Sequence, residues 1–136
     1  MLLIVQTAVP NRIQLALGEK SISATLDEEV GFHQSEVLLK LTEKFLRQAR
    51  CTWQDVRGII VALGPGGSFT ALRLGVVMAN TLAWSLKIPN VGVTGEKKTL
   101  QQLWEAGRKH LEASSRPVIL QPHYGQPPSI TKPKKK

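Results

Sequence analysis

The sequence predicts an α/β domain built on a mixed β-sheet, with the element order β-β-β-α-β-α-β-α. Three short apolar or alternating segments within residues 2–26, separated by short turns, predict an antiparallel meander. A continuous apolar run at residues 58–63 is typical of a central strand covered on both faces. Segments with helical periodicity, which come before and after that run in the sequence, predict the helices that cover the strand.

The first three strands are expected at residues 2–6, 12–17 and 21–26. The first is continuously apolar, and the other two alternate apolar with polar residues, as half-buried strands do. Gly, Pro and Asn residues between them mark the turns. Residues 27–33 begin with three acidic residues, so we expect an exposed stretch before the first helix.

The first helix is expected at residues 35–49, where apolar residues recur at three- and four-residue steps along one face. Thr52 and Asp55 have the spacing of a capping box, which predicts a short helical turn. After the strand at 58–63, the pattern predicts a helix at 71–86, a strand at 90–93 and an amphipathic helix at 96–111.

The composition changes near residue 114. Residues 1–113 carry the domain, and residues 114–136 form a tail rich in Pro and Lys. Proline-rich segments favour extended backbone. We therefore expect an extended tail that docks near residues 118–120 and Tyr124 and is loose beyond them.

The composition is that of a soluble protein, with 42% hydrophobic and 21% charged residues among 136. Cys51 is the only cysteine, which excludes an internal disulfide and favours a reducing compartment. The apolar start at residues 1–5 is too short for a signal sequence, and no stretch approaches the roughly 20 apolar residues that span a bilayer. We expect a cytoplasmic protein without a membrane contact.

The formal net charge of +8 is unevenly distributed. Residues 1–113 hold 13 Lys and Arg against 10 Asp and Glu, and the rest of the charge comes from Arg116 and four lysines after residue 131. Such a basic tail can contact RNA phosphates in a salt-sensitive way. It can equally be a solvated chain end, and the sequence leaves both interpretations open.

A glycine-rich loop joins the strand at 58–63 to the helix that follows. A strand, a tight turn and a helix N-terminus place backbone N–H groups at the positive end of a helix, which is a natural anion site. The loop is not a Walker A loop, because no Lys-Ser/Thr pair opens the helix. A sharp turn with hydroxyl caps is the competing interpretation. The residues of this candidate anion or nucleotide loop are Gly64, Gly66, Gly67, Ser68 and Thr70.

The loop and three further segments resemble TsaB proteins, also called YeaZ. Residues 64–75, GPGGSFTALRLG, resemble the family string GPGSFTGLRIG. Residues 33–39 are similar to the family's His-Ser-Glu-x-Leu-Leu segment, and residues 89–93 to the strand after the glycine-loop helix. Residues 122–128 resemble the Pro-x-Tyr-Leu-Arg-Pro-Pro end of the family. These matches occur in family order along nearly the whole chain.

The resemblance implies an actin-like or Hsp70-like (ribonuclease H-like) half-domain. It also implies a role beside TsaD and the ATPase TsaE in attaching threonylcarbamoyl to the adenosine next to the anticodon of tRNA. In that family the chemistry and the metal belong to TsaD, and TsaB supplies an interface. The resemblance therefore implies no cofactor and no catalytic residue for this chain.

Four departures from the family pattern point away from catalysis. Gln6 stands where the family's first strand usually ends in Asp, and an amide cannot hold a cation as a carboxylate does. Val37 follows His33 at the spacing where metal-binding relatives have a second His, so we expect no metal site. The loop has one extra glycine, with Ala71 in place of another. Finally, the family's second α/β half is missing from this sequence.

The helix at 71–86 carries a stripe of small residues that would let another helix approach closely. The stripe can face a partner, or it can face this domain's own sheet or first helix, and the sequence leaves both interpretations open. In the partner interpretation, the helices at 35–49 and 71–86 form the interface. Its candidate residues are Val37, Leu41, Ala71, Arg73, Gly75, Ala79 and Ala83.

Three functions follow from these observations. The leading one is a non-catalytic scaffold that binds a TsaD-like protein and a TsaE-like ATPase, forms a homodimer when TsaD is absent, and meets tRNA only indirectly. The second is a nucleotide-binding remnant of an actin-like ATPase or kinase that uses the glycine loop. The third is a tRNA-binding adaptor that uses the basic tail.

Overall fold

The computed structural model describes residues 1–31 and 34–125 of the chain. Its elements occur in the predicted order, and the short helical turn predicted after Thr52 is a 3-10 turn (η1). Their bounds are β1 Leu2–Gln6, β2 Arg12–Gly18, β3 Ile22–Glu29, α1 Gln34–Gln48, η1 Trp53–Asp55, β4 Gly58–Gly64, α2 Phe69–Leu86, β5 Asn90–Thr94 and α3 Leu100–Glu112.

The strands form one mixed sheet in the order β3-β2-β1-β4-β5. Antiparallel ladders join β1 to β2 and β2 to β3, and parallel ladders join β1 to β4 and β4 to β5. The predicted fold class is therefore confirmed. Its origin is the chain's connection lengths, since short turns permit only antiparallel neighbours and each parallel neighbour requires a helical crossover.

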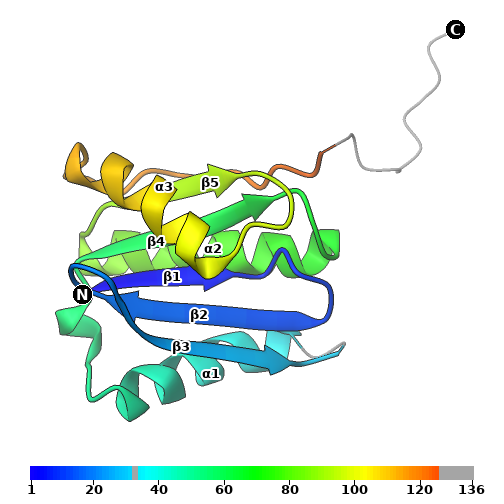
Figure 1. Ribbon diagram of the computed structural model, residues 1–136, viewed down its shortest axis with the longest axis horizontal. Coiled ribbons are helices and arrows are strands. Elements are labelled where there is room, and N and C mark those ends of the chain that lie inside the picture. The colour runs from blue at the N-terminus through cyan, green and yellow to red at the C-terminus, as the bar shows by residue number, and fades with distance from the viewer. Residues whose placement is uncertain (32–33, 126–136) are drawn as a thin grey trace, which may run out of the picture.

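Helices cover both faces of the sheet (Figure 1). On one face α1 and α2 close a core around Leu15, Ile59 and Leu72, and on the other α3 packs Leu103 and Trp104 against Ile60. β4 is buried on both faces because it lies between these two helical layers. This arrangement explains its continuous apolar sequence.

Three predicted boundaries were wrong. β3 ends at Glu29 and not at residue 26. Its three acidic residues are exposed, as expected, but they stay in the strand because they pair with β2, and Asp27 accepts a 2.7 Å hydrogen bond from the Arg12 guanidinium. α2 begins two residues early, at Phe69. α3 begins four residues late, because Gly95 and Lys97 have positive φ, and Thr99 then forms the capping box with Gln102.

The predicted capping box before η1 is present. The backbone N–H of Thr52 donates to the Asp55 carboxylate at 2.8 Å, and the Thr52 hydroxyl lies 3.2 Å from the same oxygen. These hydrogen bonds lower the pKa of Asp55. The Met1 ammonium likewise lowers the pKa of Glu19, and Asp27 raises the pKa of Arg12. All three groups are exposed.

Helix α2 is the central helix of the domain. Within the described residues it is the one helix long and apolar enough to cross a membrane, judged by length and composition alone. Its buried face packs on the sheet, however, and its flank packs on α1, where the Thr42 hydroxyl lies beside Met78. The core helix of a soluble domain meets the same criterion, so this finding is weak evidence for a membrane span.

Gly75 lets α2 approach the end of β1. A Cβ atom at Gly75 would collide with the fully buried side chain of Thr7, whose hydroxyl has no hydrogen-bond partner among the described residues. Replacement of an interior helical Gly by Ala ordinarily stabilises a helix by about 1 kcal/mol. At this position the collision opposes that gain.

We expect Gly75→Ala to lower the free energy of unfolding by about 1–3 kcal/mol, the usual cost of overpacking. Adding Thr7→Ala should recover much of the loss, because it removes the colliding hydroxyl and methyl groups. Urea denaturation of both single variants and the double variant measures the coupling. Strictly additive effects would show that Thr7 does not limit the approach of α2.

Candidate functional site

A pocket beside the glycine loop lies at the carboxyl ends of β1, β4 and β5, where open α/β sheets usually bind ligands. Its volume is about 510 Å³. The turn after β1 forms one wall, the glycine loop forms another, and the loop between β5 and α3 forms the third. The pocket is lined by, among others, Ala8, Pro10, Gly66, Gly67, Lys97 and Lys98.

The glycines of the loop are required by packing. Gly64, Gly66 and Gly67 all have positive φ. A Cβ atom at Gly66 would collide with the carbonyl oxygen of Ala8, and one at Gly64 would collide with Leu72 and with the backbone of residue 123. The glycine pattern therefore has a structural cause that needs no ligand.

The hydroxyl groups of the loop have separate positions. Ser68 is the N-cap of α2, and its Oγ accepts a 3.0 Å hydrogen bond from the backbone N–H of Ala71. Thr70 is exposed in the first turn of the helix. The hydroxyl cap, which was the alternative interpretation of these loop residues, is thus formed. Binding of an anion by this loop stays a prediction.

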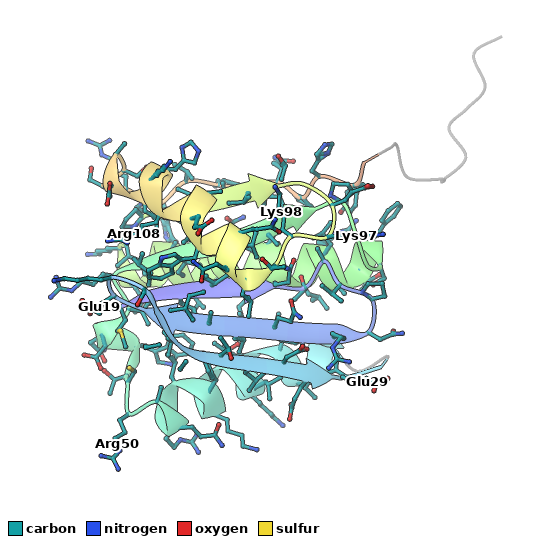
Figure 2. The ribbon with its side chains drawn as sticks, viewed as in Figure 1. Glu19, Glu29, Arg50, Lys97, Lys98 and Arg108 are labelled. Atoms are coloured by element: carbon teal, nitrogen blue, oxygen red, sulfur yellow. The ribbon has the colours of Figure 1, made fainter. Side chains whose placement is uncertain are left out.

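Gln6 ties the third wall of the pocket to the sheet. Its side chain is buried at the end of β1, and Nε2 donates a 2.7 Å hydrogen bond to the carbonyl oxygen of Lys98. Figure 2 shows Lys97 and Lys98 on the loop that follows β5. Gln6 therefore holds a loop in place at the position where the resemblance to TsaB proteins implies an acidic residue.

Candidate metal ligands do not gather in the described part of the chain, where no group of three or more His, Cys, Asp or Glu side chains is placed to hold an ion. His110 lies on α3, and His123 lies beyond it in the extended C-terminal segment. His33 lies outside the described residues.

The small-residue stripe does not reach the surface. Ala71, Gly75, Ala79 and Ala83 are all buried in the face of α2 that packs against this chain's own sheet. Of the two interpretations left open by the sequence, the structure selects the internal one. The reason is that small side chains let α2 lie close to β1 and β4, so these four residues are corrected from a partner surface to core.

The other three candidate interface residues are more accessible, to different degrees. Arg73 is exposed on α2, with Nε 3.5 Å from the Tyr124 hydroxyl. Val37 is half-buried and Leu41 is buried on α1. Both line a mainly apolar pocket of about 460 Å³ between α1 and the end of β3, with Lys40 and Lys44 beside them.

The outward side of α2 also carries two large apolar residues that the sequence analysis did not single out. Val77 and Trp84 are exposed and lie seven positions apart, two helical turns along the same side as Arg73. Their positions in the periodic pattern could have identified them, because they fall opposite the small-residue stripe.

The C-terminal residues 116–125, which we call the strap, run along α2 in the opposite direction. Val118 exchanges two hydrogen bonds with the Asn90 side chain, of 2.8 and 3.0 Å. Leu120 exchanges two with the Asn80 side chain, of 3.0 and 3.1 Å. Asn90 also donates to Asn80 at 3.2 Å. We call this pair of amides the Asn clasp.

The end of the strap covers the glycine loop. The backbone N–H of His123 donates to the carbonyl oxygen of Leu63 at 2.7 Å. The Tyr124 ring packs on Phe69 with 4.6 Å between centroids. The tail therefore docks near residues 118–120 and Tyr124, as predicted. The Asn clasp was missed, although amide side chains within an apolar helix and at the start of a buried strand were a usable signal.

Comparison with known proteins agrees with this geometry. The family model described as TsaD, tRNA N6-adenosine threonylcarbamoyltransferase, matches residues 26–121. The tRNA threonylcarbamoyladenosine biosynthesis protein TsaB of Buchnera aphidicola subsp. Schizaphis graminum is 27% identical over 109 residues, which are 80% of this chain and 51% of that protein. The protein of the same name from Bacillus subtilis is 45% identical over 66 residues, 48% of this chain and 26% of that protein.

A solved structure described as YeaZ from Pseudomonas aeruginosa superposes with a TM-score of 0.62 at 25% identity, covering 68% of this chain and 43% of that one. The sheet order and its helices thus define an actin-like (ribonuclease H-like) α/β half-domain. The chain belongs to the TsaD family, and its resemblance to TsaB and YeaZ proteins is confirmed. It spans about half the length of the Buchnera relative and a quarter of the Bacillus one.

The role of Gln6 can be tested by replacing its neutral amide with a carboxylate. We expect Gln6→Glu to lower the free energy of unfolding at neutral pH by about 1–3 kcal/mol, because a buried carboxylate cannot donate to the Lys98 carbonyl. Burial should raise the pKa of this Glu above its unfolded value. A protonated Glu can donate, so the loss should shrink as pH falls through the folded pKa.

Thermal unfolding of Gln6→Glu from neutral to mildly acidic pH checks this expectation. Gln54→Glu, at an exposed position, is the control with the same change in charge. A loss that is equal for the two variants, or that grows as pH falls, would contradict the proposed hydrogen bond.

Proposed function

We propose that this chain is a non-catalytic accessory subunit in the biosynthesis of threonylcarbamoyladenosine in tRNA, acting as a scaffold for a TsaD-like protein. The observation that supports this proposal is that the chain belongs to the TsaD family and is similar to proteins named TsaB. In this proposal the TsaD-like protein performs the transfer, a TsaE-like ATPase joins the complex, and tRNA is met through the partners. The complex would work in the cytoplasm.

The docking surface in this proposal is the outward side of α1 and α2. Arg73, Val77 and Trp84 are exposed on α2, while the inward side of the same helix is occupied by the sheet. Trp and Arg are enriched among residues that dominate binding energy at protein interfaces. An exposed Trp beside an exposed Val therefore supports docking through this side of the helix.

Nucleotide turnover by the glycine loop has weaker support. The loop glycines are already explained by close packing, and Ser68 caps its own helix. Behind the pocket beside the loop, Gln6 supplies a buried amide that bonds to the Lys98 carbonyl, at the position where the resemblance to TsaB proteins implies an acidic residue. In this proposal the loop therefore has a structural role, because its glycines let β1, α2 and the strap pack closely together.

Co-expression with the TsaD protein encoded in the same genome tests the proposal. We expect a complex of defined mass in size-exclusion chromatography with light scattering, and no threonylcarbamoyl transfer by this chain alone. When TsaD is withheld, we expect a weaker homodimer. Absence of a complex, while TsaD modifies tRNA equally well without this chain, would refute the scaffold role.

Trp84→Ala should weaken the complex about 10- to 100-fold, which corresponds to about 1.4–2.7 kcal/mol, as expected for removal of an interface hot spot. The residue is mostly exposed, so the isolated chain should unfold at nearly the same temperature. Calorimetric titration with TsaD measures the effect, and Lys109→Ala on α3 is the control. Equal affinities for the two variants would place the interface elsewhere.

A further inference from the structure

One exposed apolar surface joins α2 to the strap. Its members are Val77 (51% exposed), Trp84 (73%), Val118 (49%) and Ile119 (82%), which we call the α2–strap face. The two segments are adjacent because Asn80, one turn before Trp84, holds the backbone of Leu120, which follows Ile119. Exposed apolar residues are ordinary when scattered, but a group of this kind marks an interaction surface.

The two segments that carry this face, α2 and the strap, hold charged side chains of a single sign. The sequence has no Asp or Glu between Asp55 and Glu96 or after Glu112. Those two stretches hold eight of the 18 Lys and Arg residues, and the other ten are matched by all ten acidic residues. Four of those eight cations, Lys132, Lys134, Lys135 and Lys136, lie outside the described residues. Three others are exposed on the two segments that carry the α2–strap face: Arg73 on α2, Lys87 at the C-terminal end of α2, and Arg116 at the start of the strap.

We propose that the α2–strap face binds a protein whose docking surface is apolar at its centre and acidic at its rim, and that the Asn clasp fixes the strap beside α2 for this contact. The proposal rests on the proposed function in taking the TsaD-like protein as that partner. It adds the strap and its clasp to the helical surface.

The charges decide against a second copy of the chain as the preferred occupant. A two-fold dimer places the same patch on both sides of its interface. It would bring the cations of two chains together, with no carboxylate from the same segments to offset them. An acidic rim on the partner gives attraction at the same positions, so binding to the partner should exceed self-association.

The apolar centre decides against RNA as the occupant. Protein–nucleic acid interfaces are more polar and much more positively charged than protein interfaces. The face has four exposed apolar residues, and the same two segments carry three exposed cations. This distribution is the one typical of a protein interface, with an apolar core and a charged rim.

The Asn clasp gives the strap a defined position. Both amides bond to the backbone of the strap, and Asn90 is itself nearly fully buried and bonded to Asn80. Without these bonds the strap would still be held at His123, whose N–H donates to the Leu63 carbonyl, but no hydrogen bond in the described residues would fix Val118 and Leu120 beside α2. A preformed strap spares the complex the entropic cost of ordering it on binding.

Arg116→Glu and Lys109→Glu form a matched pair for the test. They change the net charge equally, but Arg116 lies on the strap and Lys109 lies on α3, on the opposite face of the sheet. We expect Arg116→Glu to weaken binding to TsaD about tenfold at low salt and less at high salt, since salt screens rim charges. Lys109→Glu should bind as the native chain does, and Ile119→Ser should weaken binding at both salt levels.

Equal affinities for Arg116→Glu, Lys109→Glu and the native chain would overturn the proposal and leave the scaffold role intact. No binding by the native chain would overturn both. Two further measurements without TsaD test the rejected occupants. If Arg116→Glu abolishes a homodimer, or tRNA binding, while leaving TsaD binding unchanged, the face belongs to that other occupant and the proposal is wrong.

Asn80→Ala tests the clasp separately. We expect faster hydrogen exchange of the Leu120 amide, because that N–H donates to Asn80, together with a loss of TsaD affinity similar to that of Ile119→Ser. Asn80→Asp keeps the acceptor for Leu120 but not the donor, so it should give a smaller effect if the chain folds. Faster exchange at Leu120 with unchanged affinity would show that the clasp does not serve binding.

Discussion

The close approach of α2 to the sheet is the constraint on which the rest of the structure depends. Ala71, Gly75, Ala79 and Ala83 bring the helix against β1 and β4, and Thr7 occupies the space that a larger residue at 75 would need. Because the inward side of α2 is used in this way, its outward side is the only one left for a partner among the described contacts. The small stripe determines the interface indirectly, by setting the orientation of the helix.

The glycine loop and the strap follow from the same geometry. A helix that starts so close to β1 needs glycine at the points of closest approach, because Gly66 passes the Ala8 carbonyl and Gly64 passes the backbone of the strap at residue 123. The strap then lies along the flank of α2 that α1 does not cover, held by Asn80 and Asn90. The close packing of α2 on the sheet thus accounts for the glycines of the loop, the position of the strap and the side of α2 that is exposed.

Particular segments of the chain show why some elements were predicted correctly and others were missed. The run at 58–63 and the periodicity of the helices were sufficient to predict the mixed sheet, because burial on two faces leaves a continuous apolar run in place of an alternating one. The acidic end of β3 was missed, since its pairing with Arg12 is a contact across strands. The start of α3 was missed because backbone conformation at Gly95 and Lys97 outweighed helical periodicity.

The sequence by itself determined the fold class, the order of the elements, the docking of the tail and the family resemblance carried by residues 64–75, because these properties depend on local patterns. Only the tertiary structure decided that the small stripe is core, that Gln6 supports a loop, and that two asparagines hold the strap. Each of those outcomes depends on which residues meet across the fold, and the periodicity of a single segment carries no information about what lies opposite it.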